Sequence, residues 1–179
     1  MTITNKTKLA ATVLVLAGLA IAIPSALQAS KDAATLQGGM TSKEELIRRF
    51  VAALSAGDGH ALRTLQVTET EYRDIILPGA VPVGQPMRQW PEDVRGYFTR
   101  EFIQKSQMVG ANLLENYKGH QYQIESVTFE RGTKRYSNHF AYVQLRLKLR
   151  DETGADHELA TGSIVEIGGQ YKFMSYLPG

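Results

Sequence analysis

The sequence predicts a single α+β domain in which helices come first and a four-stranded antiparallel sheet follows. Before Gly119, apolar residues recur at the three- and four-residue spacing of helices that bury one face. After Gly119, apolar and polar residues alternate as they do in strands, and short connectors with glycine separate four such stretches. Helices followed by antiparallel strands are typical of α+β folds rather than of parallel α/β folds.

The first 29 residues have the layout of a secretory signal peptide. Lys6 and Lys8 precede an uncharged apolar run over residues 9–23, and the small residue Ala29 precedes a polar stretch. The run is shorter than the roughly 20 apolar residues of a membrane-spanning helix. We therefore expect cleavage after Ala29 and export to the periplasm or the extracellular space. The alternative is an uncleaved segment that anchors the protein in a membrane by its N-terminus.

Residues 30–40 are small and polar and contain a Gly-Gly pair, which predicts a flexible tether before a folded domain over residues 41–179. The first helix is expected over residues 41–56, because Thr41 or Ser42 can cap it and apolar residues recur there at helical spacing. A glycine follows, and Asp58 can then cap a short second helix.

Two more helices are expected before the sheet. Thr68 and Glu71 have the spacing of a capping box, which predicts a third helix that Pro78 ends. Residues 78–90 contain three prolines and two glycines, which predicts a long loop. Pro91 suits the first position of a longer helix that is expected to end at Gly119.

The strands are predicted from alternation and from charge. A three-residue connector over residues 152–154 would place Arg150 opposite Asp156 and Lys148 opposite Glu158, so that opposite charges meet on the outer face. The first strand keeps its alternation only with a bulge near Glu125. The four strands are expected over residues 121–131, 136–150, 156–167 and 171–177.

The same register assigns the two faces of the sheet. A three-residue connector over residues 168–170 would pair Ile167 with Tyr171. The face toward the helices is then apolar, with a few polar groups that we predict to contact a ligand: His139, Thr161, Ser163, Tyr171 and Ser175. The outer face collects an apolar cluster that we predict to be a homodimer interface: Phe140, Tyr142, Ile164, Met174 and Tyr176.

Two stretches of the chain resemble the nuclear transport factor two-like superfamily, to which SnoaL-like polyketide cyclases and ketosteroid isomerases belong. They are SKEELIRRFVAALSAGDGHALRTL, near the start of the domain, and GSIVEIGGQYKFMSY, near its end. The resemblance covers residues 41–177. It implies a cone-like fold in which a curved sheet wraps around the helices and encloses a pocket. The superfamily includes enzymes, binding proteins and interaction modules, so the resemblance alone does not assign a function.

Composition and motifs exclude several kinds of chemistry. The chain has no cysteine, which excludes disulfides, thiolate metal sites and cysteine nucleophiles. Its four histidines lie on separate segments, so we expect no metal, and no cofactor motif is present. Without residues 1–29 the formal net charge is zero, which gives no reason to expect nucleic acid or an anionic membrane as a partner.

Three functional hypotheses follow. The first is an exported, non-catalytic domain that binds a small apolar ligand or a protein partner. Enzymes of the superfamily resemble one another in placing a carboxylate, often with tyrosine or histidine, inside the cone. The second hypothesis is therefore a small isomerase or dehydratase that uses His139 with Asp74 or Tyr72. The third is an interaction module whose cone is filled, for which Phe98, Phe102 and Leu113 are the expected filling residues.

Overall fold

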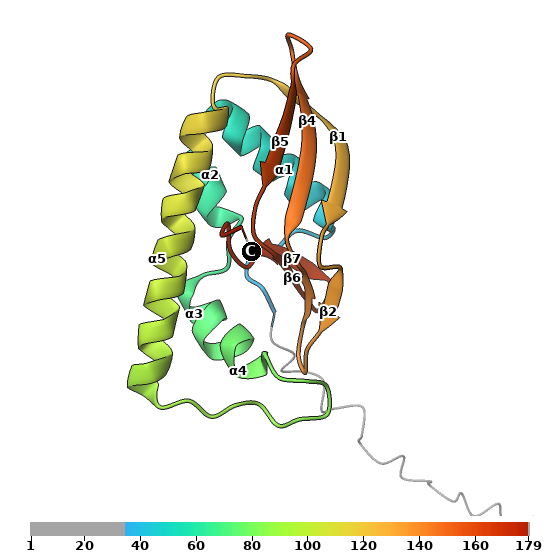
Figure 1. Ribbon diagram of the computed structural model, residues 1–179. Coiled ribbons are helices and arrows are strands. Elements are labelled where there is room, and N and C mark those ends of the chain that lie inside the picture. The colour runs from blue at the N-terminus through green and yellow to red at the C-terminus, as the bar shows by residue number, and fades with distance from the viewer. Residues whose placement is uncertain (1–34, 179) are drawn as a thin grey trace, which may run out of the picture. The chain divides into compact units, whose positions relative to one another are not determined.

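The structure is α+β, as predicted, with helices before strands and two antiparallel sheets (Figure 1). It is a computed structural model that describes residues 35–178, so the predicted signal peptide and the first residues of the predicted tether lie outside the described part. Among the described residues, no helix has both the length and the apolar composition needed to cross a bilayer.

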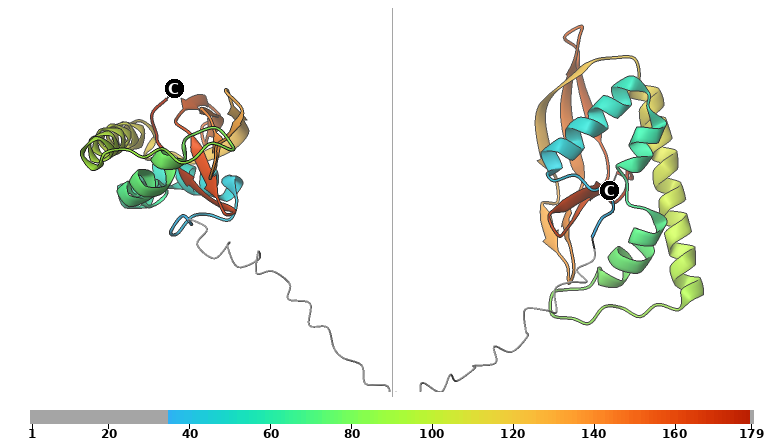
Figure 2. Two further views of the ribbon diagram at one scale, coloured as in Figure 1. Left: turned by 90° about the horizontal axis from the view of Figure 1, so that it is seen from below. Right: turned by 180° about the vertical axis from the view of Figure 1, so that it is seen from behind.

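The first two helices begin at the predicted caps. Helix α1 (Lys43–Ala56) starts after Ser42, whose side chain accepts a hydrogen bond from the Glu45 N–H. Helix α2 (Gly59–Thr64) starts after Asp58, whose carboxylate accepts from the first turn of that helix. Helix α1 crosses one face of a three-stranded sheet diagonally (Figure 2, right).

The third predicted helix is present but continues past its predicted end. The capping box of Thr68 and Glu71 opens α3 (Glu69–Glu71), which runs into a π-helical turn, η1 (Tyr72–Ile76), and then α4 (Leu77–Gly79). Pro78 lies within α4 rather than ending the helix before it, because proline is tolerated in a first helical turn. The long helix α5 (Glu92–Tyr117) buries only a narrow stripe, made of Thr99, Ile103, Ser106 and Gly110.

The strands form two sheets instead of the single four-stranded sheet that was predicted. One sheet has the order β1-β4-β5 and the other β2-β3-β6-β7. Their bounds are β1 (Tyr122–Phe129), β2 (Thr133–Arg135), β3 (Phe140–Tyr142), β4 (Leu145–Asp151), β5 (Asp156–Ala160), β6 (Ile164–Ile167) and β7 (Gln170–Phe173).

Two breaks in the chain separate these sheets. The predicted strand over residues 136–150 is interrupted at Gln144, which has a φ of 60°. The predicted strand over residues 156–167 is interrupted around Gly162, where a Cβ atom would collide with the backbone of Ser175. The two breaks lie opposite each other in the paired strands. Each predicted strand is therefore divided into two, and its two parts belong to different sheets.

The predicted register of the first hairpin is confirmed. Arg150 lies opposite Asp156, with a hydrogen bond of 3.0 Å from Nε to Oδ1, and Lys148 lies opposite Glu158. The predicted bulge in the first strand is also present, because the pairing of β1 with β4 shifts between Ile124 and Ser126.

The predicted register of the last hairpin is wrong by one residue. Gly168 and Gly169 both have positive φ, 58° and 76°, and they form a two-residue turn that pairs Ile167 with Gln170 instead of Tyr171. This shift places Phe173 opposite Ile164. The side chains of β7 are therefore shifted relative to those of β6, so that Phe173 shares a face with Ile164 and Lys172 shares a face with Val165.

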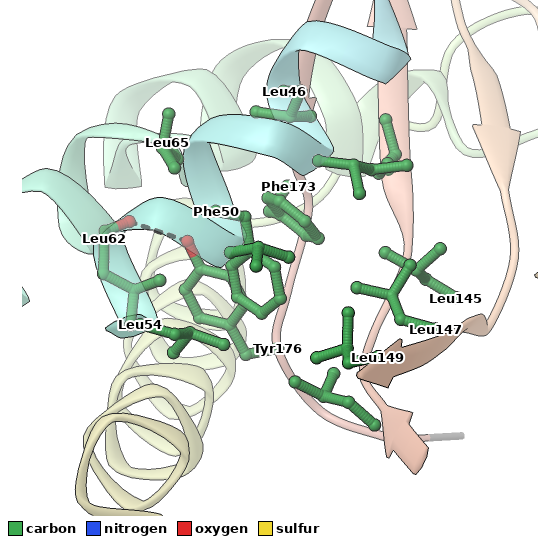
Figure 3. Close-up of a cluster of buried hydrophobic side chains, with 14 residues drawn as sticks. Leu46, Phe50, Leu54, Leu62, Leu65, Leu145, Leu147, Leu149, Phe173 and Tyr176 are labelled. Atoms are coloured by element: carbon green, nitrogen blue, oxygen red, sulfur yellow. Dashed lines mark hydrogen bonds between the residues drawn. The ribbon is translucent and has the colours of Figure 1, made fainter. Parts of the chain in front are cut away.

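The predicted dimer patch is not a surface of this structure, because both faces of β6 are covered. Ile164 packs into one apolar cluster and Val165 into another, and each is fully buried. Tyr176 is also buried and donates a hydrogen bond to the Leu62 carbonyl (Figure 3). Tyr142 and Met174 are half-buried, which leaves Phe140 as the exposed member of the five.

The last residues of the predicted tether are fixed to the domain. Leu36 is fully buried in the second cluster, and Met40 pairs with Tyr171 through two backbone hydrogen bonds of 2.8 and 2.9 Å. A buried leucine and backbone pairing together anchor this segment, which composition alone did not indicate.

Gly162, at the break between β5 and β6, should be far less tolerant of a side chain than Gly96, which lies in helix α5. Gly162→Ala should lower the free energy of unfolding by about 1–3 kcal/mol or more, because the backbone of Ser175 must move. Gly96→Ala should raise it by up to about 1 kcal/mol, since that helical position faces open space. Urea denaturation of the two variants checks the pair, and equal effects would contradict the close approach at Gly162.

Candidate functional site

The space between the helices and the sheets is filled by side chains, so the pocket implied by the resemblance is not open here. The rings of Phe50 and Phe173 lie 4.7 Å apart, and those of Phe50 and Tyr176 lie 5.6 Å apart. Figure 3 shows these rings between α1 and the leucines of β4. Of the three expected filling residues, Leu113 packs against this cluster and Phe102 against the second one, whereas Phe98 is 46% exposed on α5.

The polar residues predicted to contact a ligand serve the fold instead. Thr161 donates to the Tyr176 carbonyl at 3.2 Å, and Ser163 accepts from the Gln144 N–H at 3.4 Å. Thr161, Ser163 and Ser175 are buried beside the break at Gly162, where backbone groups leave the regular ladder.

His139 is buried, as its predicted inward position requires, but it faces other protein groups. Its ring stacks on Tyr136 at 4.7 Å, and its Nδ1–H donates to the side-chain Oδ1 of Asn138 at 2.6 Å. The Asn138 amide in turn donates to the Ile75 carbonyl in η1 at 2.8 Å. Burial lowers the pKa of His139 to about 4, so the imidazole is neutral at ordinary pH. This histidine joins the β2–β3 connection to η1.

The other two catalytic candidates do not meet His139. The Asp74 carboxylate binds the Arg73 guanidinium at 2.8 Å and lies 3.6 Å from Arg95, and the Arg73 contact lowers the pKa of Asp74. Tyr72 stacks on Phe102 with ring centroids 4.3 Å apart, and burial raises its pKa. The geometry therefore gives no support to the isomerase or dehydratase hypothesis.

The neutral state of His139 gives stability a defined pH dependence. An unfolded histidine has a pKa near 6.5, so between pH 4 and 6.5 the unfolded chain binds more protons than the folded one. The free energy of unfolding should therefore rise over this range, by up to about 3 kcal/mol from this group, and then level off.

The variant His139→Asn keeps a donor toward Asn138 but does not titrate. Urea denaturation at several pH values should show a smaller slope for this variant than for wild type between pH 4 and 6.5. His60→Asn, at an exposed histidine, is the control and should keep the wild-type slope. An unchanged slope in His139→Asn would contradict the assignment.

Two adjoining hollows lie between α1 and β1. They are two parts of one groove, of about 450 and 440 Å³, and they share Arg48 and Ile124. The first part lies between the start of α1 and the end of β1, and the second between the end of α1 and the start of β1. We call the two parts together the α1–β1 groove.

The walls of this groove are apolar on the strand side. Ile124 and Phe129 are half-buried, and Val127 is 41% exposed. Val127 and Phe129 lie opposite the buried Leu147 and Leu145, so their side chains point to the face that α1 covers. Ile47 and Val51 of α1 are almost completely buried beside them.

Within residues 35–178, the backbone of β1 has no pairing strand on its side away from β4. Asp151 and Leu145 of β4 bond to the β5 side, through hydrogen bonds with Ala155, Thr161 and Gly162. Since antiparallel strands alternate, Arg146 and Lys148 bond to the β1 side, where they lie opposite Thr128 and Ser126.

It follows that the N–H and C=O of Val127 point away from β4, at the edge of the sheet. The Phe129 N–H points the same way, whereas its carbonyl accepts a hydrogen bond from the Gly132 N–H at 3.0 Å. The open edge of β1 is therefore short.

Charge in the groove is unbalanced. Lys43 pairs with Glu44 at 2.8 Å, and Arg49 pairs with Glu45 at 2.8 Å on the neighbouring side of α1. Arg48, which both parts of the groove share, has no ion pair or hydrogen bond among the described residues. The groove therefore places one cation that is unpaired among the described residues where an apolar hollow meets one of mixed lining.

No protein-family model, curated protein or solved structure matches the chain. Among residues 35–178, no group of three or more histidine and carboxylate side chains is arranged to hold a metal ion. The site is thus defined by its own geometry. The sequence did not reveal it, because Arg48 and Arg49 are adjacent and equally charged, and only the crossing of α1 over β1 distinguishes them.

The proposed orientation of β1 can be checked amide by amide. In hydrogen-exchange NMR the Val127 amide should exchange much faster than the Ser126 and Thr128 amides, because only the latter two face β4. Thr128 is the next residue and is exposed as Val127 is, so its amide is the control. Protection of Val127 equal to that of Thr128 would show that its edge is covered.

Proposed function

We propose that this protein is an exported, non-catalytic interaction module that binds an extended segment of a partner protein in the α1–β1 groove. One observation carries the proposal: the unpaired backbone of Val127 borders an apolar hollow of about 450 Å³. An exposed strand edge is a template for pairing with another chain, and a neighbouring hollow can select its side chains.

The register of such a segment follows from strand geometry. A partner residue opposite Val127 would bond to both its N–H and its C=O. Its side chain would point to the same face as the Val127 side chain, which is the face of α1, and would enter the hollow lined by Ile47 and Phe129. An aliphatic or aromatic side chain suits that lining.

Charge complementarity specifies the partner further. Arg48 lies between the apolar hollow and the second hollow, whose lining is mixed, and it is unpaired among the described residues. A carboxylate of the partner would form a charge-assisted hydrogen bond with this guanidinium. We therefore expect an extended segment that carries an acidic residue between apolar ones.

The filled interior supports this proposal over the binding of a small ligand inside a cone. We further propose that the domain is a member of the nuclear transport factor two-like superfamily with a packed interior. The order of its elements, helices first and an antiparallel meander last, supports that membership. Export rests on the signal-peptide pattern of the first 29 residues, which also supports a partner outside the cytoplasm.

Selection from a library of random twelve-residue peptides tests the proposal. Selected peptides should share apolar residues at alternate positions and an acidic residue. A synthetic copy of one should protect the Val127 amide from exchange. Val127→Lys and Arg48→Glu should each weaken its binding at least tenfold, because they close the hollow or reverse the charge.

Matched controls exist beside each changed residue. Thr128→Lys places the same charge on the opposite face of β1, and Arg49→Glu reverses the arginine that pairs with Glu45. Both should bind the peptide within about twofold of wild type. Equal losses in the variants and their controls would overturn the proposal.

The predicted homodimer is tested in the same series. Two copies could pair their β1 edges about a twofold axis and cover Val127 without a foreign partner. Sedimentation of wild type and Val127→Lys distinguishes the two cases. A wild-type dimer that this substitution dissociates would make a second copy of this chain the occupant of the groove.

A further inference from the structure

A second hollow, of about 340 Å³, lies on another side of the domain, between α5 and the chain from η1 to Trp90. Its lining is almost entirely apolar and includes four aromatic rings. The apolar and aromatic side chains of the lining are Tyr72, Leu77, Trp90, Phe98, Phe102 and Leu177. It shares no residue with the α1–β1 groove.

The aromatic walls of this hollow hold one another in place. The rings of Tyr72 and Phe102 are stacked at 4.3 Å with an interplanar angle of 12°. The rings of Trp90 and Phe98 meet edge to face at 5.7 Å. Because η1 and α5 carry three of these rings, the hollow does not have to form when a ligand arrives.

Two features of the walls are unusual for a surface without a ligand. Phe98 is 46% exposed although it borders the hollow, so a large ring faces water. The Trp90 indole N–H is buried and has no hydrogen-bond acceptor among the described residues. A buried donor without a partner is costly, at about 1–3 kcal/mol, and calls for an explanation.

Two side chains of opposite charge, Glu101 and Lys105, line the hollow, and Arg88 lies next to one of its walls. Lys105 pairs with Glu101 at 3.2 Å, but both side chains are well exposed, so the pair is weak. The Arg88 guanidinium lies over the Trp90 ring, 5.1 Å from its centroid, and has no ion pair among the described residues. Because Glu101 and Lys105 balance each other, Arg88 leaves one net positive charge beside the Trp90 wall of the hollow.

We infer that this hollow binds a small amphipathic monocarboxylate. Its apolar body lies against Tyr72, Phe98 and Phe102, and its carboxylate lies at the mouth near Arg88 and Lys105. A volume of about 340 Å³ suits a body of on the order of ten heavy atoms. This binding is independent of the proposed partner in the α1–β1 groove.

The single tryptophan of the chain makes the test direct. Trp90 lines the hollow, so intrinsic tryptophan emission reports on this site alone. Titration with sodium octanoate, below the concentration at which it forms micelles, should change the emission saturably. The indole N–H resonance of Trp90 should shift over the same range. We expect 1-octanol to bind at least threefold more weakly and octylammonium more weakly still.

Two pairs of variants locate the binding. Phe98→Ser should weaken octanoate binding at least tenfold, whereas Tyr97→Ser, at the neighbouring exposed ring outside the lining, should not. Arg88→Gln should abolish the preference for octanoate over 1-octanol, whereas Arg100→Gln should keep it. Since these side chains are at least partly exposed, the variants should fold, which the melting temperature verifies.

Four results would overturn the inference. The first is an emission that does not saturate with octanoate, and the second is equal weakening by Phe98→Ser and Tyr97→Ser. The third is binding of octylammonium as tight as that of octanoate. The fourth is a response to vesicles of phosphatidylcholine and phosphatidylglycerol without any response to octanoate, since that would make the aromatic surface a membrane contact.

Discussion

The arrangement of the domain depends on a buried ion pair between Glu71 and Lys172. The Lys172 ammonium lies 2.9 and 3.2 Å from the two Glu71 carboxylate oxygens, and both side chains are at most 5% exposed. The same carboxylate accepts from the Gln37 N–H at 2.6 Å and the Thr68 N–H at 2.7 Å. It thus joins the N-terminal segment, the start of α3 and β7. Removing one partner from such a pair leaves a buried charge, which costs about 3–5 kcal/mol.

The strand edges around this ion pair are covered by other segments to different extents. With β7 held in place, its outer edge bonds to Met40 on one stretch and to Leu65 and Val67 on the next. Across the other sheet, Tyr117 of α5 donates to the Glu158 carbonyl of β5. Among the described residues no equivalent cover lies on β1 at Val127. The edge of β1 next to the groove is therefore open, whereas the edges of β7 and β5 are covered.

How far the sequence could predict the fold depended on whether each strand has one buried face. The β4–β5 hairpin has leucines on one face and charges on the other, so both alternation and charge specified its register. On β6 both Ile164 and Val165 are buried, and alternation carried no information there. The turn residues could not decide either, since a Gly-Gly pair fits a two-residue loop as well as part of a three-residue one. The register error followed from these two ambiguities.

The candidate site was less predictable than the fold, because it consists of relations between elements. Arg48, Val127 and Trp90 carry no local pattern that separates them from other surface residues. Two buried residues were equally hard to predict. Leu36 is an apolar residue in a polar stretch and Lys172 is a lysine in a strand, and neither pattern indicates a buried side chain. Their partners lie far away in the chain; Glu71, for example, is 101 residues from Lys172.

The short length of the open edge has a consequence for what the groove can bind. Upstream of Val127 the bulge at Glu125 interrupts the ladder, and the Glu125 carboxylate is held by Arg150 at 2.8 Å. Downstream, the Phe129 carbonyl is already bonded to Gly132. Bulges and short edges are the means by which proteins prevent continuous sheet-to-sheet association. The open stretch offers few backbone hydrogen bonds, so specificity has to come from the side chain that enters the hollow and from the charge that meets Arg48. A groove of this kind suits one short extended segment and disfavours indefinite strand stacking.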